Sequence, residues 1–330
     1  MSEYVFGIDT GATKSHLALF NTEGVLIDFG YWGPLNHELF PGSYAQFRDE
    51  FGKFVARYLS KNGISINQIA YSVHGIAGVD TKFQYENVFN IIAKMGFEKF
   101  TLVNDAFLGV PAGIPSGAGI CALNGTGSTL AGITKEGKML QIGGVGYVSD
   151  DKGGGARMGR RVISAVYSEL FRRGKATSMT PVLLERLGIT SKFDFVDKIY
   201  EKIDDGSFNV GMTQKLLFEA IAENDEVAIE ILMEIAECYA NGISGIIEDL
   251  KFNQENEINI VFAGSVFVKG EHPIMIDAIK EKVNLDNPGC RINYKLLDVP
   301  PVAGAVNWAL NTLYGKGVFY EKVCSQLRDM

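Results

Sequence analysis

Short apolar segments separated by glycine-containing turns make up the start of the chain. Residues 4–8, 16–20 and 25–29 have strand length, with a glycine loop after the first segment and an Asn-Thr-Glu-Gly turn after the second. This pattern predicts an antiparallel meander. Apolar side chains then recur every three or four positions over 44–59 and predict a helix. With strands at 69–73 and 100–103 and a helix at 83–95, the predicted order is β-β-β-α-β-α-β.

The same strand–loop–strand layout begins again near residue 118. Residues 118–123 and 129–133 predict two strands around the polar loop Asn-Gly-Thr-Gly-Ser, and 138–142 predicts a third strand. The repeat is weak in sequence but clear in layout. It predicts two lobes of similar topology, each presenting one hairpin loop.

Helical spacing takes over after the glycine-rich stretch 143–159. Apolar stripes predict helical structure around 162–171 and over 213–250. The remaining predicted elements are a strand at 258–262, a helix at 273–283, a strand at 291–296 and a helix at 301–314. A chain of 330 residues exceeds what one core usually supports, so two domains of α/β type are expected.

Charge and cysteine usage exclude several classes of protein. The formal net charge is −8, the isoelectric point is about 5.2 and no basic run is present, which argues against a nucleic-acid partner. No apolar run approaches the length of a membrane span, and the N-terminus carries no secretory pattern. The four cysteines are scattered without a CxxC pair, which fits a reducing compartment. We therefore expect a cytoplasmic protein without a membrane partner.

Two loops have the chemistry of phosphate binding. The first, Asp9-Thr10-Gly11-Ala12-Thr13-Lys14, leads from strand to strand, whereas Walker A and dinucleotide-binding loops open a helix. Its glycine lets the backbone approach closely, its amides and Thr13 can hold phosphate oxygens, and Asp9 can hold hydrated Mg²⁺. The alternative is a plain glycine hairpin. The second loop, 124–128, has the same chemistry, and together the loops favour nucleotide phosphates held between lobes.

Three further positions allow a functional and a structural interpretation. Asp105 directly follows a buried strand, where a carboxylate could accept a proton from an attacking hydroxyl or could cap a helix. Gly264-Ser265 could lie against a purine and ribose or could be a plain turn. His74 could approach a cleft, although a structural histidine is the expectation.

Taken in order, these segments resemble a known superfamily. Residues 7–15, 104–106, 123–128 and 263–266 are similar to the phosphate-1, catalytic-acid, phosphate-2 and adenosine motifs of the sugar kinase, actin and heat-shock chaperone superfamily. Within it, the chain looks most like the N-acetylglucosamine kinase branch of the BadF/BadG/BcrA/BcrD ATPase family, which is grouped with acyl-CoA dehydratase and reductase activases. The resemblance spans most of the chain.

The resemblance implies two actin-like (ribonuclease H-like) lobes with a nucleotide cleft between them. Lobe I would comprise residues 1–112 plus about 301–330, and lobe II residues 113–300. The implied activity is Mg²⁺- and ATP-dependent phosphorylation of a sugar or amino sugar of the N-acetylglucosamine or glucosamine type, at the C6 hydroxyl. A homodimer is expected.

The resemblance also implies a role for each matching residue. Asp105 would be the catalytic base and would contact the substrate, and Asp9 would associate with the metal. The residues expected to bind the nucleotide are Gly11, Thr13, Lys14, Gly125, Thr126, Gly127, Gly264 and Ser265. The other residues expected to bind the sugar are Asn36, Gly143, Gly144, Val145 and Asp151.

The chain departs from its relatives in the segment that would wrap the sugar. Relatives usually show Gly-Gly-Trp-Gly followed by Asp-Glu-Gly-Ser, whereas this chain has Val145 in place of the tryptophan and Lys152 in place of the glutamate. We therefore expect a sugar preference that differs from N-acetylglucosamine.

Two other functions remain open on the sequence. One is an activase-type ATPase that drives a partner dehydratase or reductase, and the other is a regulator that has lost turnover. Activases hold an iron–sulfur cluster on cysteines shared across a dimer. The scattered cysteines, with Cys121 inside an apolar strand, disfavour that function.

Overall fold

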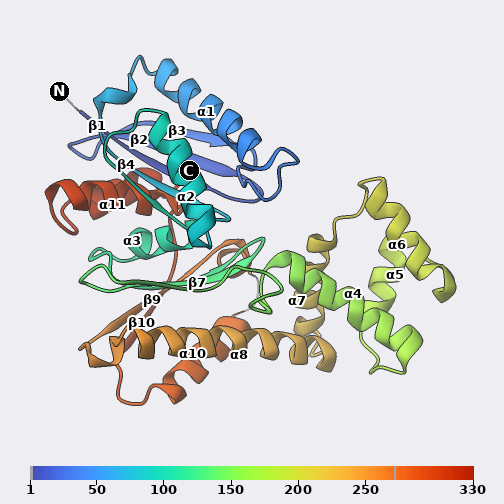
Figure 1. The fold of residues 1–330 in the computed structure, drawn as a ribbon. Coiled ribbons are helices and arrows are strands. Elements are labelled where there is room, and N and C mark those ends of the chain that lie inside the picture. Colours follow the sequence, from blue (N-terminus) through green and yellow to red (C-terminus); the bar gives the residue numbers. More distant parts are fainter. Residues whose placement is uncertain (1–2, 271–272) are drawn as a thin grey trace.

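Two five-stranded mixed sheets form the centre of the molecule (Figure 1). The computed structural model describes residues 3–270 and 273–330. The first sheet has the order β3-β2-β1-β4-β5, with β1 (Tyr4–Thr10), β2 (Ser15–Asn21), β3 (Leu26–Trp32), β4 (Ile69–Ile76) and β5 (Phe100–Val103). The second has the order β8-β7-β6-β9-β10, with β6 (Gly119–Asn124), β7 (Ser128–Ile133), β8 (Met139–Gly143), β9 (Ile258–Ala263) and β10 (Ile292–Leu296).

The two sheets share one topology. In each, the first three strands pair antiparallel, and the fourth and fifth strands run parallel to the first. The structure therefore confirms the internal repeat that the layout of strands and loops predicts. Parallel strands place their carboxyl ends at one edge, so the loops after the first, fourth and fifth strands of each sheet gather on one side.

Helices cover both faces of each sheet. The helices α1 (Ser43–Lys61) and α2 (Lys82–Lys94) share a core with the outer face of the first sheet. The helices α8 (Glu226–Asp249) and α10 (Ile274–Asp286) cover the outer face of the second. Between the sheets lie α3 (Gly109–Gly113) and α11 (Val302–Tyr314), with α12 (Tyr320–Leu327) in the same cluster (Figure 1).

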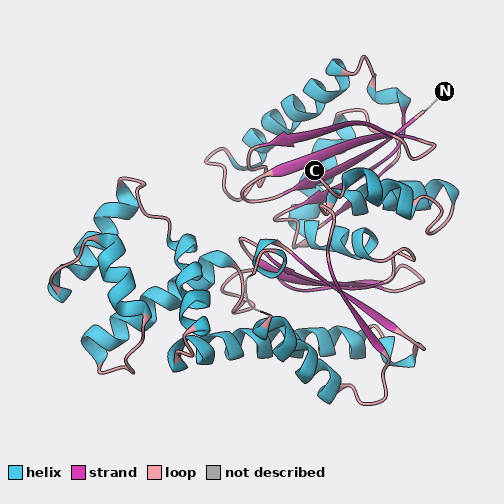
Figure 2. Cartoon of the chain, turned by 180° about the vertical axis from the view of Figure 1, so that it is seen from behind, coloured by secondary structure: helices cyan, strands magenta, loops and turns pink. Residues whose placement is uncertain are grey.

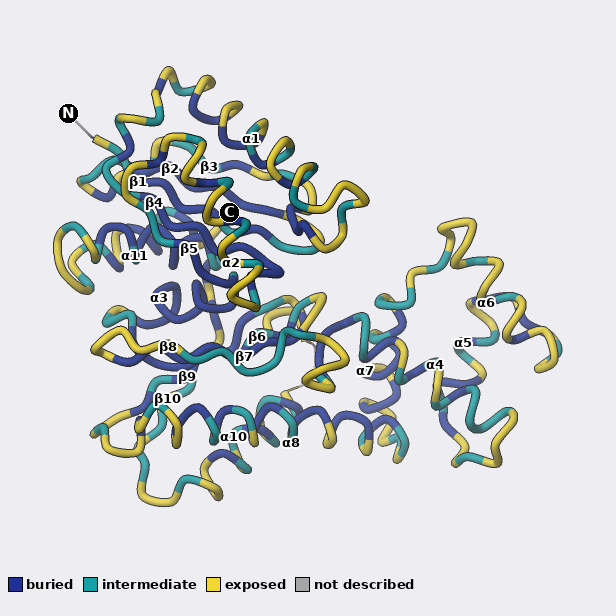
Figure 3. Tube along the Cα trace, in the orientation of Figure 1, coloured by how far each residue is buried: buried dark blue, intermediate teal, exposed yellow. Residues whose placement is uncertain are grey.

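The strand β1 shows why the sheet is buried on both faces. Phe6 and Ile8 belong to the outer core, whereas Val5 belongs to the core between the sheets. A Cβ atom on Gly7 would lie 2.8 Å from a methyl carbon of Val306, so α11 can reach the sheet only because residue 7 is glycine. Figure 3 shows α3 and most of α11 as buried, and β2 and β7 are buried almost throughout, whereas the edge strands β3, β8 and β10 are mostly intermediate or exposed.

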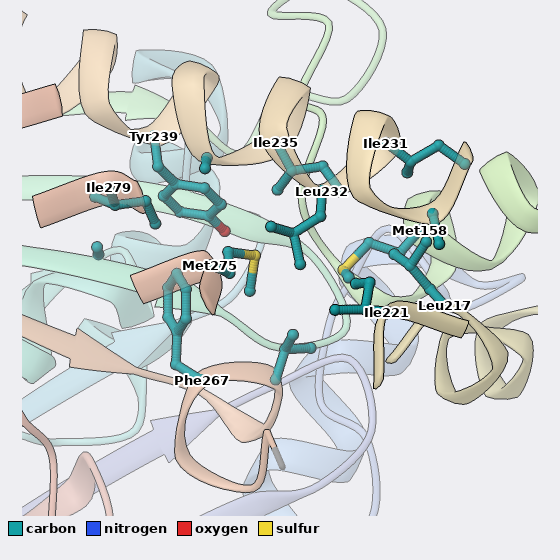
Figure 4. Close-up of a cluster of buried hydrophobic side chains, with 14 of the residues drawn as sticks. Met158, Leu217, Ile221, Ile231, Leu232, Ile235, Tyr239, Phe267, Met275 and Ile279 are labelled. Atoms are coloured by element: carbon teal, nitrogen blue, oxygen red, sulfur yellow. The ribbon is translucent and has the colours of Figure 1, made fainter. Parts of the chain in front are cut away.

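A helical extension projects from the second lobe, as Figure 2 shows from behind. It consists of α4 (Gly155–Arg172), α5 (Met179–Leu187), α6 (Phe195–Asp204) and α7 (Gln214–Ala222). Met158, Leu217 and Ile221 of this extension pack beside Ile231 and Leu232 of α8 in one cluster (Figure 4). The remaining short elements are α9 (Ser265–Val268) and the 3₁₀ turns Ile66–Gln68, Asp105–Leu108, Lys192–Asp194, Val210–Thr213 and Phe252–Gln254.

The predicted elements and the observed elements differ mainly in this extension. The sequence does not predict α5 and α6. The helical region expected at 213–250 is two helices, because Asn224 has a φ of 61° and the Asp225 side chain caps α8 by accepting from Ala228 N. In the described residues, no helix is long and apolar enough to cross a membrane. The division into lobes at residues 112 and 301 stays a prediction, although α11 does pack on β1 and β4.

Candidate active site

The two glycine-containing hairpin loops meet at the interface of the lobes. The hydroxyl oxygens of Thr13 in the β1–β2 loop and Thr126 in the β6–β7 loop lie 2.8 Å apart and share a hydrogen bond. Within the second loop, Gly125 N donates to Gly127 O at 2.9 Å. The structure thus brings together residues from the two predicted phosphate loops.

The start of α4 braces the second loop. Gly155 N donates to Gly125 O at 2.8 Å, and Gly154 N donates to Asn124 Oδ1 at 2.9 Å. Gly154 has a φ of +84°, and a Cβ atom there would lie 2.8 Å from the Gly127 backbone. Among the described residues, the buried Nδ2 of Asn124 has no hydrogen-bond partner. A buried donor beside this loop suits an anionic oxygen, because an unpaired buried amide is costly.

The turn after β9 packs directly on the same loop. Gly264 has a φ of +90°, and a Cβ atom there would lie 2.4 Å from Asn124 O, so only glycine fits. Ser265 follows it and is exposed. On the other side of the loop, a Cβ atom on Gly155 would lie 2.8 Å from Gln214 Oε1, which is buried without a partner in the described part of the chain. Sequence reasoning missed Gln214.

Asp105 opens the 3₁₀ turn that follows β5. The capping residue is its neighbour, since Asn104 Oδ1 accepts from Ala106 N at 3.0 Å. The helix-cap interpretation of Asp105 is therefore wrong, because Asn104 occupies that role. Burial, and then the negative charges of Asp9 and Asp80, raise the pKa of Asp105 to about 8. Such a carboxylate is a stronger proton acceptor than an ordinary one once it is ionised.

Asp9 lies in β1 beside His16 of β2, with 3.6 Å between Asp9 Oδ2 and His16 Nδ1. In residues 3–270 and 273–330, no group of three acidic, histidine or cysteine side chains is placed to hold a metal ion. The donor set therefore does not form an all-protein cage. One carboxylate beside phosphate-type loops does fit Mg²⁺, which keeps several waters and is bound through one or two carboxylates plus substrate phosphates.

The predicted sugar segment forms a tight loop between β8 and α4. Asp151 Oδ2 accepts from Gly144 N at 3.0 Å and from Gly146 N at 3.2 Å, so this carboxylate shapes the loop. Lys152, at the position where relatives have a glutamate, cannot supply a carboxylate, and its ammonium group forms an ion pair with Asp150. Asn36 is 7% exposed, and its Oδ1 accepts from Glu38 N at 2.8 Å, which leaves its amide nitrogen as a donor.

A set of polar residues that sequence reasoning missed connects these parts. Asp80 follows β4, and its Oδ1 accepts from Asn104 Nδ2 at 2.9 Å and from Gln141 Nε2 at 2.6 Å. Gln141 belongs to β8, so this carboxylate links the lobes beside Asp105. One signal was present, because Asp80 follows a strand as Asp105 does. The Gln141 contact had no local signal.

Two other predicted residues have different outcomes. Lys14 is exposed, and its role in phosphate binding stays a prediction. His74 is fully buried, shares a 2.8 Å hydrogen bond with Ser72 Oγ and packs against Phe97 and Phe100. Burial lowers the pKa of His74 to about 3. The structural interpretation of His74 is confirmed.

The repeated sheets and the facing loops define a two-lobed α/β protein of the actin-like class. The chain belongs to the BadF/BadG/BcrA/BcrD ATPase family, whose sequence profile matches residues 6–309. The family expected from the sequence is thereby confirmed.

Three similar proteins extend this comparison. An N-acetylmuramic acid/N-acetylglucosamine kinase of Clostridium acetobutylicum is 26% identical over 298 residues, covering 88% of this chain and 93% of the relative. An N-acetyl-D-glucosamine kinase of Dictyostelium discoideum is 27% identical over 242 residues, covering 72% and 74%. The crystal structure of a protein from Chromobacterium violaceum assigned as an N-acetylglucosamine kinase matches with a TM-score of 0.65 and 17% identity, covering 92% and 98%. The last likeness confirms the two-lobed fold.

Proposed function

We propose that the protein is an ATP-dependent carbohydrate kinase that phosphorylates an amino sugar, at the hydroxyl on C6. The observation that carries the proposal is the 2.8 Å contact between Thr13 and Thr126, which brings the two phosphate-type loops together. Asp105, with a pKa raised to about 8, lies close enough to Asp9 to be affected by its charge. Membership of an ATPase family and similarity to two amino-sugar kinases support the same activity.

The proposed mechanism is in-line phosphoryl transfer. Asp105 orients the sugar hydroxyl and accepts its proton as the hydroxyl attacks the terminal phosphate. Thr13, Thr126 and the amides around Gly11, Gly125 and Gly127 hold the phosphate oxygens. Asp9 would hold Mg²⁺, and the bound ion would neutralise charge on the phosphates. Closure of the lobes excludes water and limits ATP hydrolysis without sugar.

The proposed substrate contacts occupy both sides of the cleft. Asn36 of the first lobe donates from its amide nitrogen to the sugar. The backbone of Gly143, Gly144 and Val145, held by Asp151, encloses the sugar from the second lobe. Gly264 and Ser265 lie against the adenosine, and Lys14 reaches the phosphates.

The activase function has no specific support. Cys121 and Cys324 are buried, and Cys238 and Cys290 are partly buried. Burial raises the pKa of the Cys121 thiol to about 12, which disfavours the thiolate that an iron–sulfur cluster needs.

A panel of sugars and amino sugars, assayed for ADP release with Mg-ATP, tests the proposal. We expect ADP release that depends on an amino sugar, a product with phosphate on C6 by ³¹P–¹H NMR, and no iron in the aerobically purified protein. Stoichiometric iron with ATP hydrolysis that does not depend on sugar would instead support the activase.

We also propose a cytoplasmic homodimer, which light scattering on the purified protein and fractionation of cells would test.

A further inference from the structure

A small acidic pocket opens beside the proposed sugar segment. Its volume is about 370 Å³, at the small end of the range for ligand pockets. One lobe contributes Glu38, Asp80, Thr81 and Gln84, and the other contributes the backbone around Gly144, Val145 and Gly146. Among the described residues, no lysine or arginine lines the pocket. Its ionisable groups are therefore carboxylates only.

Each carboxylate is held through one oxygen by neutral amides. Asp80 Oδ1 accepts from Asn104 Nδ2 and Gln141 Nε2, and within the described residues Asp80 Oδ2 accepts no hydrogen bond. Glu38 Oε1 accepts from Gln84 Nε2 at 2.8 Å. These bonds fix the orientation of both side chains without neutralising their charges.

Gln84 also joins the two acidic segments. Its Oε1 accepts from Asp80 N at 3.0 Å and from Thr81 N at 2.9 Å, while its Nε2 holds Glu38. One side chain at the start of α2 therefore fixes the backbone of Asp80 and the carboxylate of Glu38 before any ligand binds. Pre-organised groups of this kind contribute more to binding because less ordering is needed.

The negative charges of the pocket repel one another. Burial raises the pKa of Asp80 to about 6, the hydrogen bond from Gln141 opposes this rise, and the charges of Glu38 and Asp151 add to it. The lysine of the neighbouring loop, Lys152, is paired with Asp150. A cation entering the pocket would gain charge-assisted hydrogen bonds and relieve the repulsion between these carboxylates.

We propose that the pocket binds the protonated amine of a hexosamine, with Asp80 as the specificity-determining residue and Glu38 as its partner. The substrate of the kinase is then an amino sugar with a free amine. An N-acetyl group carries no charge for these carboxylates, and a sugar acid such as N-acetylmuramic acid brings a repulsive one. This inference rests on the proposed kinase function.

The test compares kcat/KM for D-glucosamine, N-acetylglucosamine and glucose in the wild type, Asp80→Asn and Glu38→Gln. The Asp80→Asn change keeps a side-chain oxygen to accept from Asn104 and Gln141 and removes only the charge. We expect glucosamine to exceed glucose by about tenfold or more, the range for a hydrogen bond to a charged group. Asp80→Asn should lower kcat/KM for glucosamine by about tenfold while glucose changes by less than about threefold. Glu38→Gln should have a smaller effect, since Glu38 is exposed.

Asp49→Asn is the matched control, because it removes one exposed negative charge outside the cleft. Equal kcat/KM for the three sugars, or an Asp80→Asn variant that loses all three alike, would overturn the inference while leaving the kinase in place. Absence of turnover with every sugar would contradict the proposed function instead. Calorimetric titration of the three sugars, with a non-hydrolysable ATP analogue present, then tests the amine site without requiring turnover. Stronger binding of glucosamine that is lost in Asp80→Asn would support the inference. Equal binding of the three sugars would overturn it.

Discussion

The two sheets have the same strand order but differ in the residues at their functional edges. Near the carboxyl ends of its first, fourth and fifth strands, the first sheet carries Asp9, Asp80 and Asp105. The second sheet carries Asn124 at the end of its first strand and Gly264 directly after its fourth, and the backbones of these two residues pack closely together. In the proposed function, one lobe would supply carboxylates for the metal, the amine and the proton, and the other would supply neutral donors for the phosphates and the adenosine. The two lobes therefore share a strand order but differ in the chemistry of their functional edges.

The fifth strands show the difference most sharply. Asp105 and Asp298 both follow a fifth strand, but Asp298 pairs with Lys295 at 3.1 Å and with Arg328 at 3.0 Å. Although burial acts to raise it, these ion pairs hold the pKa of Asp298 below its ordinary value. Burial and two other carboxylates do the opposite at Asp105. Position in the fold does not by itself make a base, since the charges around the carboxylate decide its pKa.

The largest expected effect comes from Asp105→Asn. Removing a positioned general base should lower kcat by roughly 10²–10⁴-fold, with little change in the KM for the sugar. Asp298→Asn, the equivalent change in the other lobe, should leave kcat within about twofold, because it affects only exposed ion pairs. Steady-state kinetics of both variants and of the wild type measure kcat and the KM for the sugar. If Asp105→Asn keeps more than about a third of the wild-type kcat, the base must be assigned elsewhere.

The glycines that follow the fourth strands should separate the two substrates. Gly264→Ala places a Cβ atom 2.4 Å from Asn124 O, and Gly78→Ala places one 2.8 Å from Asn36 Oδ1, both at positive φ. Strain of about 1–3 kcal/mol at each site predicts roughly tenfold effects. We expect Gly264→Ala to raise the KM for ATP and Gly78→Ala to raise the KM for the sugar. Circular dichroism checks that both variants fold. The same KM rising in both would contradict the division between lobes.

The two loop threonines should behave alike although they come from opposite lobes. Each of Thr13→Val and Thr126→Val removes a hydroxyl at nearly constant volume, and each should raise the KM for ATP by about three- to tenfold, the value of one hydrogen bond. Thr22→Val, in the turn between β2 and β3, is the control and should change nothing. An effect confined to one loop would show that only one lobe binds the phosphates.

The last expected effect concerns the pH dependence of stability, not catalysis. Asp105 has a pKa of about 8 in the folded protein and an ordinary value of 3.8 when unfolded. The folded state therefore binds the extra proton between these values, and the wild type loses stability as the pH rises through this window. Asp105→Asn removes that loss, so its melting temperature should exceed that of the wild type by more at pH 8 than at pH 5. The difference in melting temperature between Asp298→Asn and the wild type should be the same at pH 5 and pH 8. The pKa of Asp298 is lowered, so this carboxylate stays ionised over the whole window.

Melting curves of the protein without nucleotide or sugar measure both differences. A pH-independent difference for Asp105→Asn would show that this carboxylate is ionised throughout the range. The pKa of Asp105 would then not be raised above that of an ordinary aspartate, and the proposed electrostatic difference between Asp105 and Asp298 would be wrong.

Much of the framework could be predicted because it depends on local patterns. Alternating strands and turns predict both sheets, and the glycine loops at residues 9–14 and 124–128 predict the place where the lobes meet. The helix α5 and the contact between Asp80 and Gln141 were not predicted. The latter joins residues 61 positions apart in different lobes, and no spacing in the sequence encodes it. Asn104 and Asp105 compete for the same cap, and only the folded turn shows which side chain takes it.

We propose above all that the two lobes together transfer phosphate from ATP to an amino sugar. The most direct measurement is the ratio of sugar phosphate to ADP formed by the wild type with Mg-ATP and D-glucosamine, together with ADP release when no sugar is present. We expect one sugar phosphate for each ADP and little ADP without sugar, because Asp105 needs a positioned hydroxyl and closure of the lobes excludes water. ADP release that is the same with and without sugar, and no sugar phosphate from D-glucosamine or from any other amino sugar tested, would contradict the transfer.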